Sequence, residues 1–296
     1  MSSLKIGVVG IPGKWSTEVL ANEIEKRTGF RLVIELAKLE LNLTQGCVTF
    51  AGHNLCELDG IIIKKIGSDF GHVSIERLEL LRVAEACGVR VFSSANSLIR
   101  LLDRLTCSVT LRNHQIPMPQ TLITESVDSA LTKILEWNSA VIKPLFSTKA
   151  RGMQILCAQQ SKDELILELN RYKARHPILY VQKKIELGGQ DMALIFLKGQ
   201  FIGAYARVAA QHTWNTTIHS GGHYAPYTPD NQTLSIAERA QSAFNLDFAT
   251  VDIAMTPEGP VVFEVSTLGG FKGAKMGCGI DVASIYADYA IQELSA

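Results

Sequence analysis

The sequence has few cysteines, no surplus of charge of either sign and no long apolar run. Its six cysteines are widely spaced and include no C-x-x-C pair, so reduced thiols are expected rather than a zinc site or a disulfide framework. Lysine plus arginine and aspartate plus glutamate both number 29, which leaves no basic excess to attract nucleic acid or an anionic membrane. No apolar run approaches the ~20 residues that cross a bilayer. The first residues also lack the pattern of a cleavable signal peptide, so we expect a cytoplasmic protein without nucleic-acid or membrane partners.

The G-x-G-x-x-G fingerprint of nicotinamide-binding domains is also missing. A nicotinamide-dependent enzyme would rest only on the alternation of strands and helices near the N-terminus, so it ranks last among the functions considered.

Strand-like and helix-like segments alternate over about the first 95 residues. Apolar runs predict strands, and amphipathic segments predict helices between them. The expected strands cover residues 5–11, 31–35, 60–64 and 90–92, and the expected helices cover residues 17–28 and 75–87. Ser16 is expected to cap the first helix and Gly29 to end it. Lys64 and Lys65 end a predicted strand; they could face a cleft, but the default expectation is that they are solvated. Such alternation is typical of a parallel sheet with helical crossovers.

The remaining chain has the pattern of antiparallel α+β structure. One helix is expected over residues 96–112, ended by Pro117 and Pro119, and another over residues 127–137. Strands are expected over residues 120–123, 140–143, 153–156, 179–185, 193–197, 201–206, 248–254 and 261–265. Turn residues such as Lys198-Gly199 separate several of these strands.

Two acidic residues are predicted to face each other on one hairpin. If Pro257, Glu258 and Gly259 form a three-residue loop, Asp252 lies opposite Glu264 with Cβ atoms about 5 Å apart. Two carboxylates at that distance repel by roughly 1–3 kcal/mol, so a divalent cation or a raised pKa must offset the repulsion. Hard oxygen ligands of this kind suit Mg²⁺. A solvent-facing polar stripe explains the hairpin alone about equally well.

A lysine ends the apolar strand over residues 140–143 and precedes a basic loop of small residues. Lys143 is placed to reach a nucleotide from the strand, and Lys149 would lie on a flap that closes over phosphates. Taken by itself, this segment is better explained as an ordinary exposed hairpin with a basic tip.

The order of these segments resembles one family over nearly the whole chain after residue 60. The segments that carry the resemblance are Asp103-Arg104-Leu105-Thr106, Ile116-Pro117-Met118-Pro119, Val141-Ile142-Lys143-Pro144, Tyr180-Val181-Gln182, Gly189-Gln190-Asp191, Arg207, His219-Ser220-Gly221-Gly222, Val251-Asp252 and Phe263-Glu264-Val265-Ser266. Together they resemble the ATP-grasp ligases, and among these the RimK-like glutamate ligases. A narrower resemblance, carried by residues 147–153, 214–217, 262–266 and 269–271, is to the ATP-grasp enzyme of the three-gene GAK system.

The resemblance implies a mixed α/β and α+β architecture, the ATP-grasp fold. A Rossmann-like pre-ATP-grasp domain would cover residues 1–95. Residues 96–183 would form a small lobe with the phosphate flap, and residues 184–296 a large lobe with the Mg-binding hairpin. The two lobes would clamp ATP between them.

The resemblance also implies the roles of individual residues. Catalysis would involve Lys143 and Arg207. Nucleotide binding would involve Arg104, Lys143, Lys149, Gln182, Lys183, Lys184, Ile185 and Asp191. Asp252, Glu264 and Ser266 would hold Mg²⁺, with two ions expected.

The function implied is an ATP-dependent carboxylate–amine ligase that forms an amide through an acyl phosphate. Its substrates would be a small-molecule or peptide carboxylate and an amine, its partners the proteins of a GAK-type cassette, and its assembly a homo-oligomer. Several family positions differ, however: Ala193, Asn215 and Thr217 replace basic or amide residues, and Ser266 replaces an asparagine. The alternative is therefore a catalytically weakened ATP-binding module that acts through partner proteins.

Overall fold

A computed structural model describes residues 4–67, 71–148, 150–211 and 213–296. Its α-helices are α1 (Trp15–Thr28), α2 (His72–Ala86), α3 (Ala95–Leu102), α4 (Arg104–Asn113), α5 (Val127–Trp137), α6 (Lys162–Lys173), α7 (Asn231–Ser242), α8 (Phe271–Cys278) and α9 (Val282–Ser295). The short 3-10 helices are η1 (Leu36–Lys38), η2 (Leu55–Glu57) and η3 (Ile218–Ser220).

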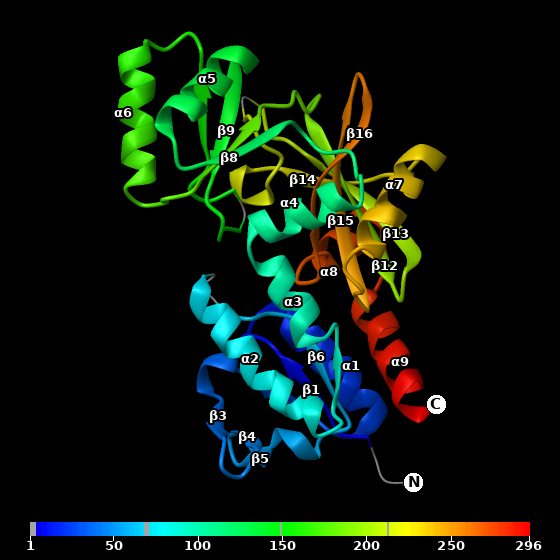
Figure 1. The fold of residues 1–296 in the computed structure, drawn as a ribbon. Helices are drawn as coiled ribbons and strands as arrows, with labels where there is room; N and C mark the ends of the chain where they lie inside the picture. The colour runs from blue at the N-terminus through cyan, green and yellow to red at the C-terminus, as the bar shows by residue number, and fades with distance from the viewer. Residues whose placement is uncertain (1–3, 68–70, 149, 212) are drawn as a thin grey trace.

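The strands form four sheets (Figure 1). The first sheet contains β1 (Ile6–Val9), β2 (Leu32–Ile34), β6 (Gly60–Ile63) and β7 (Arg90–Phe92). The second contains β3 (Glu40–Asn42), β4 (Cys47–Phe50) and β5 (His53–Asn54). The third contains β8 (Thr121–Thr124), β9 (Ser139–Lys143), β10 (Gln154–Cys157) and β11 (Leu179–Lys183). The fourth contains β12 (Gln190–Leu197), β13 (Gln200–Val208), β14 (His223–Pro226), β15 (Phe248–Thr256) and β16 (Gly259–Ser266).

The N-terminal sheet is parallel, as its sequence pattern predicts. Its order is β2-β1-β6-β7, and every pair runs parallel. All residues of β1 and β6 are buried, as expected for central strands covered on both faces. Gly29 ends α1 in the left-handed conformation with a φ of 71°, as predicted. The prediction for Ser16 is wrong, because α1 begins at Trp15 and its N-cap, Lys14, makes no side-chain capping bond.

The three-stranded sheet β3-β4-β5 was not predicted. Its strands are only two to four residues long, so any alternation of buried and exposed residues spans too few positions to stand out. The sheet lies at the lower edge of the molecule in Figure 1, beside the end of α2. Short strands of mixed polarity carry too little periodicity to be recognised from sequence.

The single helix predicted over residues 96–112 is two helices. Asp103 separates them: it takes an extended conformation, and its side chain accepts a hydrogen bond from the backbone N–H of Thr106 as the N-cap of α4. Arg104 is therefore the first residue of α4 rather than a mid-helix residue. Its backbone N–H donates to the carbonyl of Leu145, just after β9, over 2.9 Å.

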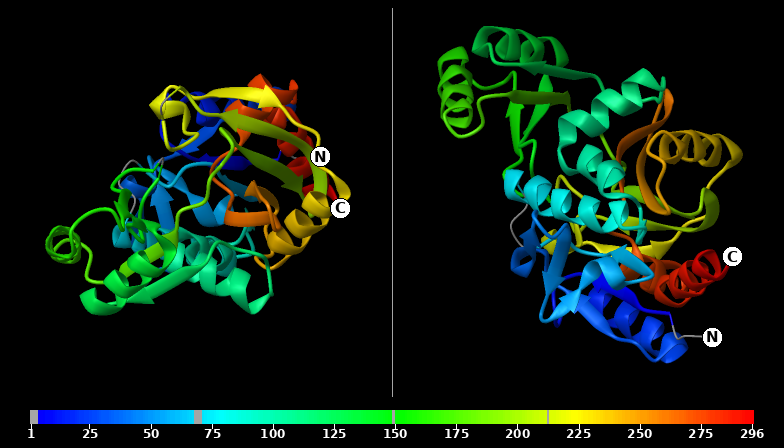
Figure 2. Two further views of the ribbon diagram at one scale, coloured as in Figure 1. Left: turned by 90° about the horizontal axis from the view of Figure 1, so that it is seen from above. Right: turned by 60° about the horizontal axis from the view of Figure 1, so that its bottom comes forward.

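A small antiparallel sheet in the order β10-β9-β11-β8 stands apart from the rest of the chain and carries α5 and α6 (Figures 1 and 2). Its core combines Ile134 of α5, Leu165 and Leu169 of α6, and the strand residues Ile142 and Val181.

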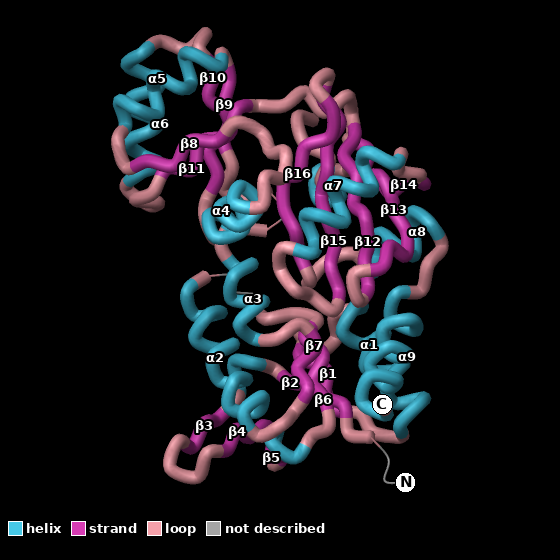
Figure 3. Tube along the Cα trace, turned by 45° about the vertical axis from the view of Figure 1, so that its right-hand side comes forward, coloured by secondary structure: helices cyan, strands magenta, loops and turns pink. Residues whose placement is uncertain are grey.

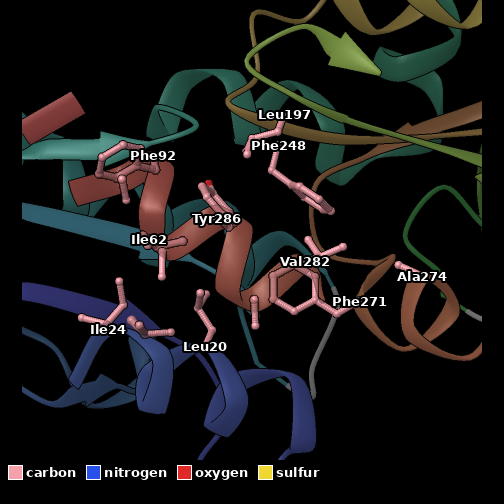
Figure 4. Packing of buried hydrophobic residues seen from close by; sticks show 14 of the residues in the cluster. Leu20, Ile24, Ile62, Phe92, Leu197, Phe248, Phe271, Ala274, Val282 and Tyr286 are labelled. Atoms are coloured by element: carbon pink, nitrogen blue, oxygen red, sulfur yellow. The ribbon is translucent and has the colours of Figure 1, made fainter. Parts of the chain in front are cut away.

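The largest sheet is antiparallel, in the order β14-β13-β12-β15-β16 (Figure 3). One face buries Leu194 and Val251 in a cluster with Leu111 of α4 and Ala237 of α7. The other face meets α8 and α9, and Figure 4 shows Phe248 of β15 beside Phe271 and Tyr286 there.

That second face shares its core with the N-terminal sheet. Leu20 and Ile24 of α1 and Ile62 of β6 belong to the same buried cluster as Val282 and Tyr286 of α9 (Figure 4). The parallel sheet and the largest sheet are therefore joined by continuous apolar packing through α9.

Candidate functional site

Asp252 and Glu264 are directly opposite each other on β15 and β16, as the sequence predicts. The predicted route to this pairing is wrong in one detail. Thr256 pairs with Gly259 rather than with Pro260, so the loop is one residue shorter than expected. A register shift between Asp252 and Ile253 then leaves Phe263 without an opposite residue and restores the predicted pairing.

The pair lies on the face of the large sheet that carries α8. Residues opposite each other in an antiparallel pair share a face, and so do residues two apart on one strand. Ser266, two residues beyond Glu264 and opposite Thr250, therefore belongs to the same surface. The Asp252 side chain is 15% exposed and that of Glu264 44% exposed, so an ion can approach this oxygen set from solvent.

Arg207 bridges two carboxylates on this same face of the sheet. It is the cross-strand partner of Asp191, and its guanidinium bonds both oxygens of that side chain, with Nε 3.1 Å from Oδ1. Its Nη2 also lies 2.8 Å from Oδ2 of Asp252. Burial raises the pKa of Asp252 to about 7 against the opposing effect of Arg207, and the neighbouring Glu264 and Asp191 raise it further. Arg207 therefore only partly offsets the cost of holding this acid ionised.

Arg104 approaches the other acid of the pair. Its Nη1 is 3.8 Å from Oε2 of Glu264, and its Nε donates to the carbonyl of Pro144 over 3.3 Å. The side chain is only 9% exposed, and its guanidinium lies over the Tyr180 ring at 5.8 Å. Arg104 thus connects the base of the predicted flap with the Asp252/Glu264 hairpin.

Lys143 is buried at the end of β9. Its Nζ donates to Oε1 of Gln182 over 2.5 Å and lies 5.2 Å from the centre of the Phe263 ring. Burial, assisted by Arg104, lowers the pKa of Lys143 to about 7, while Glu264 acts in the opposite direction. In the described part of the chain no carboxylate lies within ion-pair distance of this amine, so a phosphate oxygen would be a favourable partner.

A buried hydrogen-bond network holds Gln182, the hydrogen-bond partner of Lys143. Gln182 Nε2 donates to the Thr121 hydroxyl over 3.0 Å and to the Tyr180 hydroxyl over 3.4 Å. The Tyr180 hydroxyl contacts the Ser108 hydroxyl at 2.8 Å, and Ser108 donates to the carbonyl of Arg104. The side chain of Gln182 therefore orients Lys143.

The other predicted nucleotide-binding residues lie where the two antiparallel sheets connect. Lys183 ends β11 and pairs with Ala140, and the backbone N–H of Lys184 donates to the carbonyl of Ser139 over 3.0 Å. Ile185 follows in the segment that leads to β12, and the Lys184 side chain pairs with Glu186. Lys149 lies outside the described residues.

Contacts of Lys64, Lys65 and His72 join the N-terminal part of the chain to the site. Lys65, also expected to be solvated, is half-buried, and its Nζ donates to the carbonyl of Leu268 over 2.7 Å. Lys64, expected to be solvated, is 1% exposed; its Nζ donates to the carbonyls of Leu268 (3.1 Å) and Gly269 (2.8 Å) in the loop after Ser266. This Nζ also lies 3.8 Å from the centre of the Phe271 ring. His72 of α2 contacts Phe146, at the base of the flap, with ring centres 4.6 Å apart. The only sequence signal for the contact of Lys64 with this loop was a lysine at the end of a predicted strand.

Asp252 and Glu264 offer two carboxylates to a metal ion, and Ser266 offers a hydroxyl. Within residues 4–67, 71–148, 150–211 and 213–296, no group of three or more His, Cys, Asp or Glu side chains is arranged to hold a metal ion. The set of Asp252, Glu264 and Ser266 instead fits Mg²⁺, which commonly takes one or two protein carboxylates and completes its shell with phosphate and water.

None of the described helices is long and apolar enough to cross a membrane.

The fold and this site define an ATP-grasp protein. The RimK-like ATP-grasp domain model matches residues 102–290, and the chain belongs to that family. The chain is similar to the tetrahydromethanopterin:α-L-glutamate ligase of Methanosarcina acetivorans, with 26% identity over 96% of this chain and 98% of that protein. It is also similar to the probable α-L-glutamate ligase 2 of Hahella chejuensis, with 25% identity over 98% of this chain and 96% of that protein.

Solved structures show the same fold. The ATP-grasp ligase PsnB, in complex with a phosphomimetic variant of its minimal precursor, Mg and ADP, superposes with a TM-score of 0.77. The two chains are 16% identical over 99% of this chain and 100% of PsnB. The predictions of an ATP-grasp fold and of an ATP-grasp ligase of the RimK-like type are therefore confirmed.

Proposed function

We propose that this chain is an ATP-dependent carboxylate–amine ligase that uses the Asp252/Glu264 hairpin to hold Mg·ATP. The observation that carries the proposal is the juxtaposition of this acid pair with Arg104, Lys143 and Arg207. A buried lysine without a carboxylate partner, close to a pair of oxygen ligands, is the arrangement that a polyphosphate with its cation would complete.

The proposed domain division follows the sheets. Residues 1–95 would form a pre-ATP-grasp domain, residues 96–183 the small lobe and residues 184–296 the large lobe, with ATP between the two lobes. Residues 184–189 lead from β11 to β12, and this supports a hinge whose backbone at Gln182, Lys183, Lys184 and Ile185 would meet the adenine. Lys143 would contact the phosphates from the small lobe.

The proposed reaction has two steps. A substrate carboxylate attacks the γ-phosphorus of ATP, releasing ADP and forming an acyl phosphate; an amine then attacks the acyl carbon, forming the amide and releasing phosphate. Two Mg²⁺ ions, held by Asp252, Glu264 and Ser266, would neutralise charge on the phosphates. Arg207 would steady the transferred phosphoryl group while Asp191 orients its guanidinium, and Lys143 would supply a second positive charge.

We propose a peptide or a small amino acid as substrate. Relatives named as α-L-glutamate ligases support an amino acid, and PsnB with its precursor supports a peptide. Ala193, directly opposite Asp252 and fully buried, stands where the family resemblance leads us to expect an arginine. The lost cation argues for a less acidic substrate than free glutamate. Partner proteins of a GAK-type cassette, and a homo-oligomer, are part of the same proposal.

The second candidate is an ATP-binding module with weakened catalysis. Arg207 is engaged by both Asp191 and Asp252, and Ser266 is a weaker metal ligand than an amide oxygen would be. Both features would lower turnover without preventing nucleotide binding.

ADP release distinguishes the two candidates. The protein is mixed with Mg·ATP and a panel of amino acids and peptides, with hydroxylamine added to trap an acyl phosphate as a hydroxamate. A ligase releases ADP and forms hydroxamate with at least one carboxylate. Nucleotide binding without turnover across the whole panel favours the binding module.

A further inference from the structure

Two thiols from different elements meet at one backbone carbonyl, and a third cysteine is next to that carbonyl along the chain. The Sγ atoms of Cys56 and Cys87 lie 3.9 Å and 3.8 Å from the carbonyl oxygen of Gly46, and Cys47 is the next residue along the chain. Cys47 begins β4, Cys56 lies in η2 and Cys87 follows the last residue of α2. All of them are free thiols, and Cys87 is exposed.

The local fold holds the Cys56 and Cys87 thiols at one carbonyl. Gly46 has a φ of 64° in the turn before β4, which presents its carbonyl to both sulfurs. The backbone N–H of Cys87 donates to the carbonyls of Val83 and Ala84, so the end of α2 is well defined. The neighbouring Cys56 thiol is the main reason that the pKa of Cys87 is raised. Cys47 differs, because its Sγ contacts Oε1 of Gln45 at 3.7 Å.

We propose that Cys56 and Cys87 are a dithiol modification site that closes to a disulfide by exchange with a small-molecule disulfide such as oxidised glutathione. The two sulfurs lie within 4 Å of the same carbonyl oxygen. The parts of the chain that the structure describes contain no group of three or more His, Cys, Asp or Glu side chains arranged to bind a metal. Oxidation of a pair is therefore favoured over metal binding by all three cysteines.

The exchange balances in two steps. The Cys87 thiolate attacks one sulfur of oxidised glutathione, forms a mixed disulfide and releases one glutathione thiolate. The Cys56 thiolate then attacks the Cys87 sulfur, forms the protein disulfide and releases the second glutathione. Two electrons and two protons pass from the protein to glutathione. Because the thiolate is the attacking species, the rate should increase as the pH is raised.

This site is remote from the acid pair. Figure 1 places β3, β4 and β5 at the lower edge of the molecule, away from β15 and β16. The proposed dithiol site does not depend on the proposed ligase function, and it is tested independently of it.

The test counts thiols on the reduced full-length protein. The protein is incubated with increasing ratios of oxidised to reduced glutathione and quenched with acid. It is then unfolded and alkylated, and its mass is measured by mass spectrometry. Six alkylated thiols are expected before oxidation and four after it, together with a peptide that links Cys56 to Cys87 under non-reducing digestion. Pretreatment with phenylarsine oxide, which bridges neighbouring thiols, should prevent the link.

Serine variants provide the controls. Cys56→Ser and Cys87→Ser should each abolish the linked peptide, whereas Cys157→Ser, whose thiol contacts the Ser139 hydroxyl at 3.6 Å, should form it like the wild type. The proposal is overturned if the wild type keeps all its thiols. It is equally overturned if oxidation stops at glutathione adducts, or if Cys47 supplies one half of the disulfide. These wild-type outcomes decide the matter even if a serine variant fails to fold.

Discussion

Asp252 and Glu264 are cross-strand partners, and each carboxylate is approached by a different arginine from a different element. Arg207 of β13 lies 2.8 Å from Asp252, and Arg104 at the start of α4 lies 3.8 Å from Glu264. Without these arginines the pair would combine like-charge repulsion with the cost of burial. The raised pKa of Asp252 shows that the arginines do not fully offset that cost. A bound cation would supply the remaining stabilisation.

Neutralising one acid should remove the metal-dependent chemistry. Glu264→Gln keeps the size of the side chain but removes a charged ligand, so Mg²⁺-dependent ATP turnover should decrease by about 100-fold or more while the circular dichroism spectrum is unchanged. The matched control is Glu258→Gln, in the exposed turn of the same hairpin, which should keep wild-type turnover. Full activity in Glu264→Gln would refute the metal role.

Removing the buried lysine should weaken nucleotide binding. Lys143→Ala deletes a charge-assisted contact with phosphate, so the ATP concentration for half-maximal binding should increase about 10- to 100-fold. Lys133→Ala, on the surface of α5 in the same part of the chain, serves as the control because its partners, Glu136 and the Trp137 ring, both belong to α5. An unchanged ATP requirement in Lys143→Ala would mean that the phosphates lie elsewhere.

Nucleotide binding should take up a proton near pH 8. The pKa of Lys143 is lowered to about 7, so most of this amine is neutral at pH 8 in the free protein. Phosphate favours the charged form and raises the pKa, so ATP binding should be accompanied by uptake of up to about one proton and should strengthen as the pH falls from 8 to 7. Calorimetry in two buffers of different ionisation enthalpy measures this uptake. Equal binding enthalpies in both buffers, or the same uptake in Lys143→Met, would contradict the assignment.

Arg207 should matter for stability as well as activity. Arg207→Leu leaves Asp191 and Asp252 together without their shared cation, so the free energy of unfolding should decrease by about 3–5 kcal/mol at pH 8. Urea titration measures the change. Arg171→Leu removes an exposed arginine that pairs with Glu168 on α6, and this control should cost about 1 kcal/mol or less. Equal losses in the two variants would show that Arg207 stabilises the fold no more than an exposed arginine does.

The acid pair could be predicted because the register of a hairpin follows from its turn and its alternation. The predicted turn was one residue too long, and the unpaired Phe263 compensated for that error. A bulge has no strong sequence signal, since it depends on how the twisted strands pack. The predicted pairing of Asp252 with Glu264 is therefore correct because the shorter turn and the unpaired Phe263 shift the register in opposite directions.

Contacts between distant segments could not be predicted in the same way. The sequence predicted a solvated Lys64 at the end of a strand. Lys64 is buried instead, because the loop after Ser266 covers it and two carbonyls of that loop accept hydrogen bonds from its amine. The break at Asp103 was missed because the residues on either side have continuous helical periodicity, although an aspartate before Arg104 and Thr106 is a capping signal. Local patterns specified the strands and the site residues, whereas side-chain partners such as Gln182 for Lys143 required the three-dimensional fold.

Titration calorimetry of ATP with and without Mg²⁺ tests the central claim most directly. If Asp252 and Glu264 jointly hold the cation that bridges to the phosphates, omitting Mg²⁺ should weaken ATP binding to the wild type by at least about tenfold. The same omission should have little effect on Glu264→Gln. ATP affinity in the wild type that is the same with and without magnesium would contradict this account.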